Sequence, residues 1–395
     1  MNNTNQKILV VDDEPDLQML MLQKFRDKVK NKEFEFLFAE DGEEALHSLE
    51  QNQDVSLVLA DINMPKMDGL TMLSELQKLN RYDLKTVMVS AYGDMGNIRT
   101  AMNRGAYDFV TKPIDFKDLE ATIEKTLREI WRIHESREME AQLKALNVDL
   151  DMAARIQQKL LQQDFPVFPD DSRFDIFANM MAAKHVGGDF FDFFMYDDHH
   201  LAFFIGDVAG KGMPAAIYMA VCCTMLKAIG SEVFDPGKCL EKVNQMLIPE
   251  SEESTFVTVF YGVLNISDGT FHYSNGGHEQ PFLLTGNGEA YQLEDVGGLL
   301  LGKFEMAEYD TKTLKLSPGS SITTFTDGIT EAVAENDDFF ESSRLMEYLQ
   351  KTHSKKIDAR IKGLFIEVMK FAGAAEQSDD ITALAVEYHG GQCDA

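Results

Sequence analysis

Two aspartates face each other in a predicted β-hairpin within residues 187–212. Two apolar, aromatic-rich runs, Phe190–Met195 and Leu201–Ile205, flank a polar turn, which is the pattern of two antiparallel strands. With the turn centred between the runs, Asp189 lies opposite Asp207. Paired side chains are about 5 Å apart, and facing carboxylates destabilise a sheet. A hard cation such as Mg²⁺ or Mn²⁺ would remove that penalty. The alternative is an acidic edge that limits aggregation.

Two more acidic clusters occur late in the chain. Asp327 follows an apolar run in FTDGITE, and Asp379 and Asp380 precede the last apolar run in SDDIT. Each alone is more often a turn or cap residue than a ligand. Together with the hairpin pair they provide at least four carboxylates at strand ends, which suits two metal ions that activate a bridging water toward phosphorus. No Cys–His or Ser–His–Asp motif competes with this interpretation.

The first 124 residues alternate strand-like and helix-like segments, which predicts a doubly wound parallel sheet. The amphipathic pieces include Asp16–Val29 and Leu70–Leu79. The strand-like runs are Ile8–Val11, Phe34–Phe38, Val55–Ala60, Thr86–Val89 and Tyr107–Val110. In such sheets, functional groups gather at the carboxyl ends of the strands.

The polar residues at those strand ends predict a second acidic pocket. Asp12 and Asp13 end the first strand, Asp61 ends the third, Ser90 the fourth and Lys112 the fifth. Mg²⁺ and the lysine ammonium would balance the three carboxylates. A carboxylate beside Mg²⁺ can attack phosphorus and form an acyl phosphate, which a hydroxyl and an ammonium could hold. The alternative is a set of solvated helix caps.

Four motifs of this region resemble the receiver domain of bacterial response regulators, a flavodoxin-like fold. They are VVDDE (10–14), LADINMPKMDG (59–69), VSAYG (89–93) and GAYDFVTKP (105–113). The resemblance implies phosphorylation by a sensor histidine kinase, and a cis peptide before Pro113. The implied roles are phospho-acceptor and Mg²⁺ ligand for Asp61, further Mg²⁺ ligands for Asp12, Asp13 and the backbone carbonyl of Asn63, and switch residues for Ser90, Phe109 and Lys112. Plain core packing remains the alternative for Phe109.

Residues 125–163 are predicted to form a helical, coiled-coil linker. Apolar residues alternate in steps of four and three, with Gln157 as the one polar position. This seam spans about three heptads, the lower limit for a coiled coil. The seam positions are Met139, Leu143, Leu146, Leu150, Ala153 and Leu160. We expect the last receiver helix to continue into this segment and to pair in a homodimer. An amphipathic helix lying on one domain is the alternative.

Residues 164–390 combine many strand-like runs with a few helices, which predicts an α+β domain with a two-sheet core flanked by helices. Its motifs resemble PPM (protein phosphatase 2C-like) metal-dependent phosphatases, in particular the SpoIIE-type bacterial branch. They are AARIQQKLLQQDFP (153–166), VGGDFFD (186–192), IGDVAGKGMPAA (205–216), TFVTVFYGVL (255–264), SNGGHEQPFLL (274–284), FTDGITEA (325–332) and SDDITALAV (378–386).

This second resemblance implies a two-metal site with Mn²⁺ or Mg²⁺. Asp189 and Asp207 would bridge the ions with help from the carbonyl of Val208, and Asp327 and Asp379 would complete the coordination. Asp380 stands where the wider superfamily often has Asn, so its role stays open. That superfamily commonly has an arginine that binds the phosphate and a histidine that could protonate the leaving group. Neither has a counterpart at the expected position in this sequence. We interpret Lys211 as a charged residue of a loop without a role in the site, and His278 as a residue with a structural role.

Composition limits the other functions. The chain has 395 residues and a formal charge of −29, which opposes non-specific binding to nucleic acid or anionic membrane. We expect no signal peptide and no membrane-spanning run, and the four cysteines suit reduced thiols in the cytoplasm. The leading hypothesis is an enzyme that dephosphorylates a partner protein; family resemblance suggests a STAS-type anti-sigma-factor antagonist. The alternative is a phosphorylation-controlled adaptor for a sigma or anti-sigma regulator.

Overall fold

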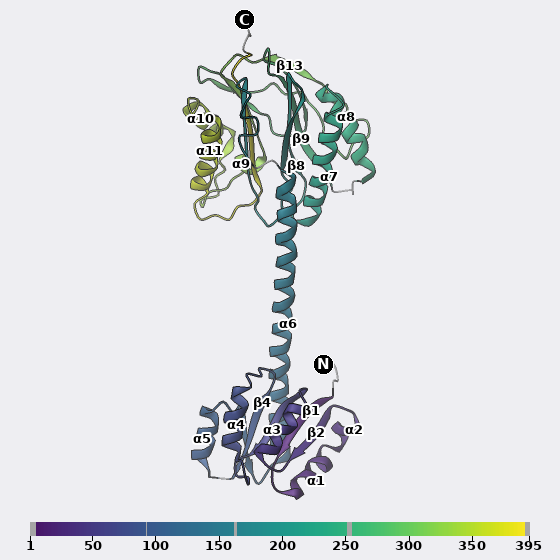
Figure 1. Ribbon diagram of the computed structural model, residues 1–395, viewed down its shortest axis with the longest axis vertical. Coiled ribbons are helices and arrows are strands. Elements are labelled where there is room, and N and C mark those ends of the chain that lie inside the picture. Colours follow the sequence, from purple (N-terminus) through teal and green to yellow (C-terminus); the bar gives the residue numbers. More distant parts are fainter. Residues whose placement is uncertain (1–4, 92, 162–163, 251–254, 392–395) are drawn as a thin grey trace. The chain divides into compact units, whose positions relative to one another are not determined.

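The computed structural model describes residues 5–91, 93–161, 164–250 and 255–391. Several residues named in the sequence predictions lie outside the described part. They are Tyr92 in the VSAYG motif, Gln162 and Gln163 at the end of the predicted linker, and Cys393. The chain divides into two compact units, residues 1–146 and 147–395, which are drawn with their elements in Figure 1.

The first unit is the predicted doubly wound domain, a parallel five-stranded sheet in the order β2-β1-β3-β4-β5. Its strands are β1 (Gln6–Val11), β2 (Phe34–Ala39), β3 (Val55–Asp61), β4 (Lys85–Ala91) and β5 (Asp108–Lys112). Its first five helices are α1 (Pro15–Lys24), α2 (Arg26–Lys30), α3 (Gly42–Gln51), α4 (Gly69–Lys78) and α5 (Met95–Asn103). Both faces of the sheet are covered, which explains the nearly continuous apolar runs of its strands.

Two local details of this unit bear on the sequence predictions. The single helix expected over 16–29 is divided at Phe25, which leaves the helical conformation at φ −98° and ψ 17°. The buried Phe25 ring packs against the rings of Phe34 and Phe36, so the break serves the core. The peptide bond between Lys112 and Pro113 is cis, as the resemblance implies.

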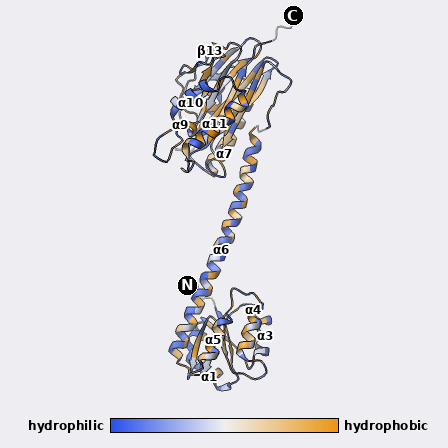
Figure 2. Cartoon of the chain, turned by 90° about the vertical axis from the view of Figure 1, so that its left-hand side faces the viewer, coloured by the Kyte–Doolittle hydropathy of each residue, from blue (hydrophilic) through white to orange (hydrophobic). Residues whose placement is uncertain are grey.

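The helix α6 runs without interruption from Phe116 to Leu160. Figure 2 shows it as mostly hydrophilic, with separate hydrophobic positions along its length. Met139, Leu143 and Leu146 of the predicted seam are between 54 and 59% exposed. Gln157, the polar position of the seam, is buried.

The second unit contains two antiparallel five-stranded sheets, which confirms the predicted two-sheet core. Their orders are β13-β10-β9-β8-β7 and β12-β11-β14-β15-β6. The strands are β6 (Phe174–Met181), β7 (Phe190–Asp197), β8 (His200–Val208), β9 (Val257–Asn265), β10 (Thr270–Gly276), β11 (Phe282–Leu284), β12 (Ala290–Gln292), β13 (Lys312–Lys315), β14 (Ser320–Phe325) and β15 (Ile381–Tyr388).

Helices cover the outer faces of both sheets (Figure 1). α7 and α8 pack on the β7–β10 side, and α11 packs on β6 and β15. The helices are α7 (Met213–Gly230), α8 (Pro236–Leu247), α9 (Asp327–Thr330), α10 (Glu341–Lys351) and α11 (Ile357–Ala372), with a 3₁₀ turn, η1, at Ile248–Glu250. Buried aromatic and aliphatic residues from both inner faces form the main core between the sheets.

The helix α7 is unusually apolar. Contrary to the sequence prediction, its length and composition would suffice to cross a membrane, and 44% of the segment is buried inside the domain. Its contacts with β7, β8 and α8 explain the apolar composition. It contributes Cys222 and Cys223 to the core as free, buried thiols, and burial raises the pKa of Cys223 to about 12.

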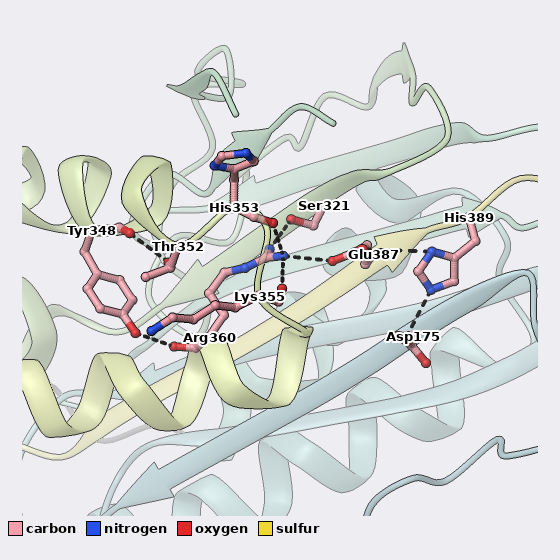
Figure 3. Close-up of polar contacts among 9 residues, drawn as sticks. All are labelled: Asp175, Ser321, Tyr348, Thr352, His353, Lys355, Arg360, Glu387 and His389. Carbon is pink, nitrogen blue, oxygen red and sulfur yellow. Dashed lines mark hydrogen bonds and ion pairs between the residues drawn. The ribbon is translucent and has the colours of Figure 1, made fainter. Parts of the chain in front are cut away.

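One buried arginine on α11 contacts the start of β14 and the end of β15. Arg360 on α11 donates from Nη1 to Ser321 Oγ at 2.7 Å and from Nη2 to Glu387 Oε2 at 2.9 Å. Nη2 also donates to the carbonyls of His353 and Lys355, in the loop before α11, at 3.3 and 3.1 Å. Figure 3 shows these contacts converging on the guanidinium. The arginine therefore ties the loop between α10 and α11 to the sheet.

Candidate metal centres

The receiver-like unit gathers three of the predicted ligands into one cluster. Carboxylate oxygens of Asp12, Asp13 and Asp61 lie within 4.8 Å of one another. Asp12 and Asp61 are buried, and Asp13 is exposed. The backbone N–H of Asn63 donates to Asp61 at 3.2 Å, so the Asn63 backbone also borders the cluster. An all-carboxylate set open on one side fits a hard cation such as Mg²⁺.

Lys112 supplies a counter-charge inside this cluster. Its ammonium lies 2.5 Å from Asp61 Oδ2 and 3.0 Å from Asp12 Oδ2. Burial alone would lower the pKa of Lys112, but the bonds to Asp61 and Asp12 outweigh it and raise that pKa. Burial raises the pKa of Asp12. The lysine therefore stays charged and partly compensates the acidic pair.

Of the three predicted switch residues, Ser90 lies on β4, and Phe109 and Lys112 lie on β5. The Ser90 hydroxyl is buried and has no hydrogen-bond partner within the described residues. A phosphoryl group on Asp61 would offer it an acceptor. Phe109 on β5 is 36% exposed, which does not fit plain core packing.

In the second unit, the hairpin register brings Asp189 and Asp207 face to face. β7 and β8 are antiparallel, and Phe190 pairs with Gly206. Asp189 precedes that pair on one strand and Asp207 follows it on the other, so the next facing positions are these two aspartates. Asp207 itself pairs with Thr258 on β9. The acidic pair thus lies at one end of the central strands.

Two threonines hold the buried carboxylate of Asp189. The hydroxyls of Thr326 and Thr382 donate to Asp189 Oδ2 at 2.7 and 2.6 Å. Burial, followed by the charge of Asp207, raises the pKa of Asp189 well above its usual range, while the two threonines oppose the rise. Neither threonine was predicted from the sequence, although each lies within three residues of a predicted ligand.

The other predicted ligands add negative charge without full compensation. Burial, then the charges of Asp327 and Asp379, raises the pKa of Asp207 to about 7. Burial and Asp379 also raise the pKa of Asp327. Among the described residues of this unit, no three of these acids are as tightly clustered as the receiver trio. Carboxylates that are spread out and only partly compensated fit two divalent cations, whose centres are about 3.5–4 Å apart in such sites.

Two glycines allow the loop before β7 to approach this site. A Cβ on Gly188 would lie 2.7 Å from the carbonyl oxygen of Val208, and one on Gly187 would lie 2.0 Å from Asp380 Oδ2. Asp380 accepts hydrogen bonds from the backbone N–H groups of Gly188 and Ala183 at 2.7 and 2.8 Å. Asp380 therefore orders the loop, which answers a question that the sequence left open.

The end of α6 contacts the same loop. The Gln157 side chain donates to the carbonyl of Gly187 at 2.7 Å, and its Oε1 accepts from the Gly187 N–H at 3.1 Å. These two hydrogen bonds satisfy the buried side-chain amide of Gln157. They also join the linker helix to Gly187, which precedes Asp189 by two residues in the loop.

His278 is buried near the site and contributes no positive charge to it. Its Nδ1 lies 2.9 Å from the hydroxyl of Thr258, and its backbone is bonded to Asn275. Burial lowers the pKa of His278 to about 4, so the imidazole is neutral near pH 7. These contacts favour the structural role that the sequence analysis assigned to it.

The folds and the acidic sites define two classes of domain: a response-regulator receiver and a PPM-type metal-dependent phosphatase domain. The comparisons with known proteins agree. The family model "Response regulator receiver domain" matches residues 8–124, and the model "Stage II sporulation protein E (SpoIIE)" matches residues 197–389. The matched segments are therefore those of a receiver domain, over residues 8–124, and of a SpoIIE-type PPM phosphatase domain, over residues 197–389.

Individual relatives cover parts of the chain. Protein IcfG of Synechocystis is 30% identical over 60% of this chain and 41% of its own length. Phosphoserine phosphatase RsbU of Bacillus subtilis is 27% identical over 60% of this chain and 69% of its own length. The chain thus spans about two fifths of the IcfG protein. The SiaA-PP2C domain of Pseudomonas aeruginosa, at 20% identity and a TM-score of 0.57, covers 63% of this chain and 99% of its own and shares the fold.

Proposed function

We propose that a sensor histidine kinase phosphorylates the receiver on Asp61. The buried Asp61 carboxylate beside the Lys112 ammonium supports this role. Asp12, Asp13 and the Asn63 carbonyl would hold Mg²⁺, which supplies the charge neutralisation that phosphoryl transfer needs. The Ser90 hydroxyl, which has no hydrogen-bond partner within the described residues, and the partly exposed Phe109 would report the modification.

We propose that the output domain hydrolyses phosphoserine or phosphothreonine on a partner protein. Asp189, Asp207, Asp327 and Asp379, with the Val208 carbonyl, would hold two Mn²⁺ or Mg²⁺ ions. When bound, these ions supply a water activated for attack on phosphorus. The observation that carries this proposal is the facing pair of the buried Asp189 and the partly buried Asp207, whose raised pKa values indicate negative charge that a cation would neutralise.

One relative's name supports phosphoserine as the group that is hydrolysed. RsbU is named as a phosphoserine phosphatase, and the family resemblance points to a phosphorylated STAS-type anti-sigma-factor antagonist as the partner. The charge of −29 opposes nucleic acid and anionic membrane as partners. We assign the protein to the cytoplasm, where its buried free thiols would stay reduced.

We propose that the signal passes along α6 and that two α6 helices pair in a homodimer. The exposed apolar seam at Met139, Leu143 and Leu146 supports pairing. The contact of Gln157 with Gly187 supports coupling, because a displaced helix end would pull on the loop before Asp189.

The test measures phosphate release from a phosphoserine peptide as a function of Mn²⁺, with and without a phosphoryl mimic on Asp61, alongside the solution mass. We expect Mn²⁺-dependent release that changes with the mimic. Metal binding without turnover would contradict the enzyme and favour the adaptor.

A further inference from the structure

Lys211 places a positive charge at the edge of the acidic site in the phosphatase domain. It lies in the short connection between β8 and α7. Its ammonium is 2.8 Å from Asp379 Oδ2 and donates to the carbonyl of Ser378 at 2.6 Å. Its charge also acts on Asp327 and Asp380. One lysine thus faces several of the acidic residues, although the sequence suggested only a loop charge.

The surroundings of Lys211 are open. Its neighbours Gly210 and Gly212 have φ angles of +103° and +80°, and no heavy atom beyond their chain neighbours lies within 4 Å of the position of a Cβ on either. The Lys211 side chain is 47% exposed. The helix α7 starts at Met213 without a side-chain cap, so helix N–H groups without intrahelical partners begin two residues after Lys211. Space and positive potential therefore coincide here.

A substrate phosphoryl group needs a cation at this position. The group is dianionic near neutral pH, and it must approach a site built from at least four aspartates. Lysine binds phosphate as a compact point charge with three donors. We propose that Lys211 binds the phosphoryl oxygens of the substrate and of the phosphate product. This inference rests on the proposed hydrolytic function.

The competing explanation is that Lys211 only balances Asp379. The two explanations predict different effects of removing Lys211 on phosphate affinity and the same effect on metal affinity. In both, removing the ammonium leaves the affinity for Mn²⁺ unchanged or increases it, because a neighbouring positive charge disappears. A phosphate-binding role further requires that phosphate affinity falls.

The experiment compares the native chain with Lys211→Met, both loaded with Mn²⁺, by calorimetric titration with inorganic phosphate. We expect phosphate affinity to fall about tenfold to 100-fold, the range for one hydrogen bond to a charged group. The KM for a phosphoserine peptide should rise in parallel. Lys211→Arg should restore a large part of both. Lys351→Met is the matched control, since Lys351 pairs with Glu347 on α10.

Two results would separate the failures. Equal phosphate affinities in the native chain and Lys211→Met, or no phosphate binding by the native chain, would overturn the inference. Absence of Mn²⁺-dependent peptide hydrolysis by the native chain would overturn the proposed function instead. A parallel Mn²⁺ titration of each variant shows that the metal site has been retained.

Discussion

The receiver and the phosphatase domain each contain a cluster of aspartates that is only partly exposed to solvent, and they balance its charge differently. In the receiver, Lys112 bonds to both Asp12 and Asp61. In the phosphatase domain, Lys211 pairs with Asp379 at the edge, and no ion pair within the described residues reaches Asp189 or Asp207. A cluster with its own ammonium can fold without a metal at modest cost, whereas the other retains unpaired negative charge that a divalent cation would neutralise.

The largest effect is expected when one carboxylate without an ion-pair partner is removed from the phosphatase domain. Asp207→Asn should lower Mn²⁺-dependent peptide hydrolysis at least about 1000-fold, because a ligand shared by the proposed ions is lost. Phosphorylation of Asp61 should continue, as measured by phosphate incorporation. Asp310→Asn, at an exposed position, is the control. Unchanged turnover in Asp207→Asn would contradict the assignment of the metal site.

The pH dependence of metal-free stability should reveal the same unpaired charge. The pKa of Asp207 is about 7 in the folded chain and about 3.9 when unfolded. The folded state therefore binds more protons between these values. Its free energy of unfolding should decrease as pH rises from about 4 to 7, by about 2–4 kcal/mol, as measured by urea unfolding of the phosphatase domain within the full chain. Mn²⁺ should abolish the decrease, since it replaces the proton. A stability that increases over this range would contradict the charge balance.

Lys112→Met should turn the receiver cluster into an uncompensated one. We expect the receiver to lose about 2 kcal/mol of metal-free stability, because Asp12 and Asp61 are then buried without a partner. Mg²⁺ should restore more stability to the variant than to the native chain. Hydrogen exchange of the receiver strands, with and without Mg²⁺, measures both effects. Equal Mg²⁺ responses would show that Lys112 is not the counter-charge.

The smallest expected effect concerns the threonines that hold Asp189. Thr382→Val removes one hydroxyl donor, so the pKa of Asp189 should rise further and Mn²⁺ should bind about tenfold more weakly at pH 7. Thr382→Ser keeps the hydroxyl and should bind Mn²⁺ as the native chain does. Calorimetry measures the affinities. A valine variant with native affinity would mean that this hydrogen bond does not tune the site.

The fold and the outline of both sites could be predicted from the sequence because their signals are local. The pairing of Asp189 with Asp207 followed from centring the turn between the two apolar runs. At the turn itself Asp197 pairs with His200, and an irregularity between Met195 and Asp197 shifts the register so that Phe190 pairs with Gly206. The strand-end acids of the receiver followed from the rule for parallel sheets. The contacts missed join distant segments: Thr382 to Asp189, and Gln157 to Gly187. No local pattern encodes these pairs, since they depend on how two sheets and a helix pack.

Arg360 has a practical consequence for such experiments. Its four acceptors anchor α11 and the preceding loop to the start of β14 and the end of β15, whereas Asp327 and Asp379 adjoin the opposite ends of those strands. A substitution at Arg360 would therefore weaken the scaffold while leaving every proposed ligand intact. Its loss of activity would measure the effect of destabilising the domain alone. The losses in variants near the aspartates can then be compared with that value.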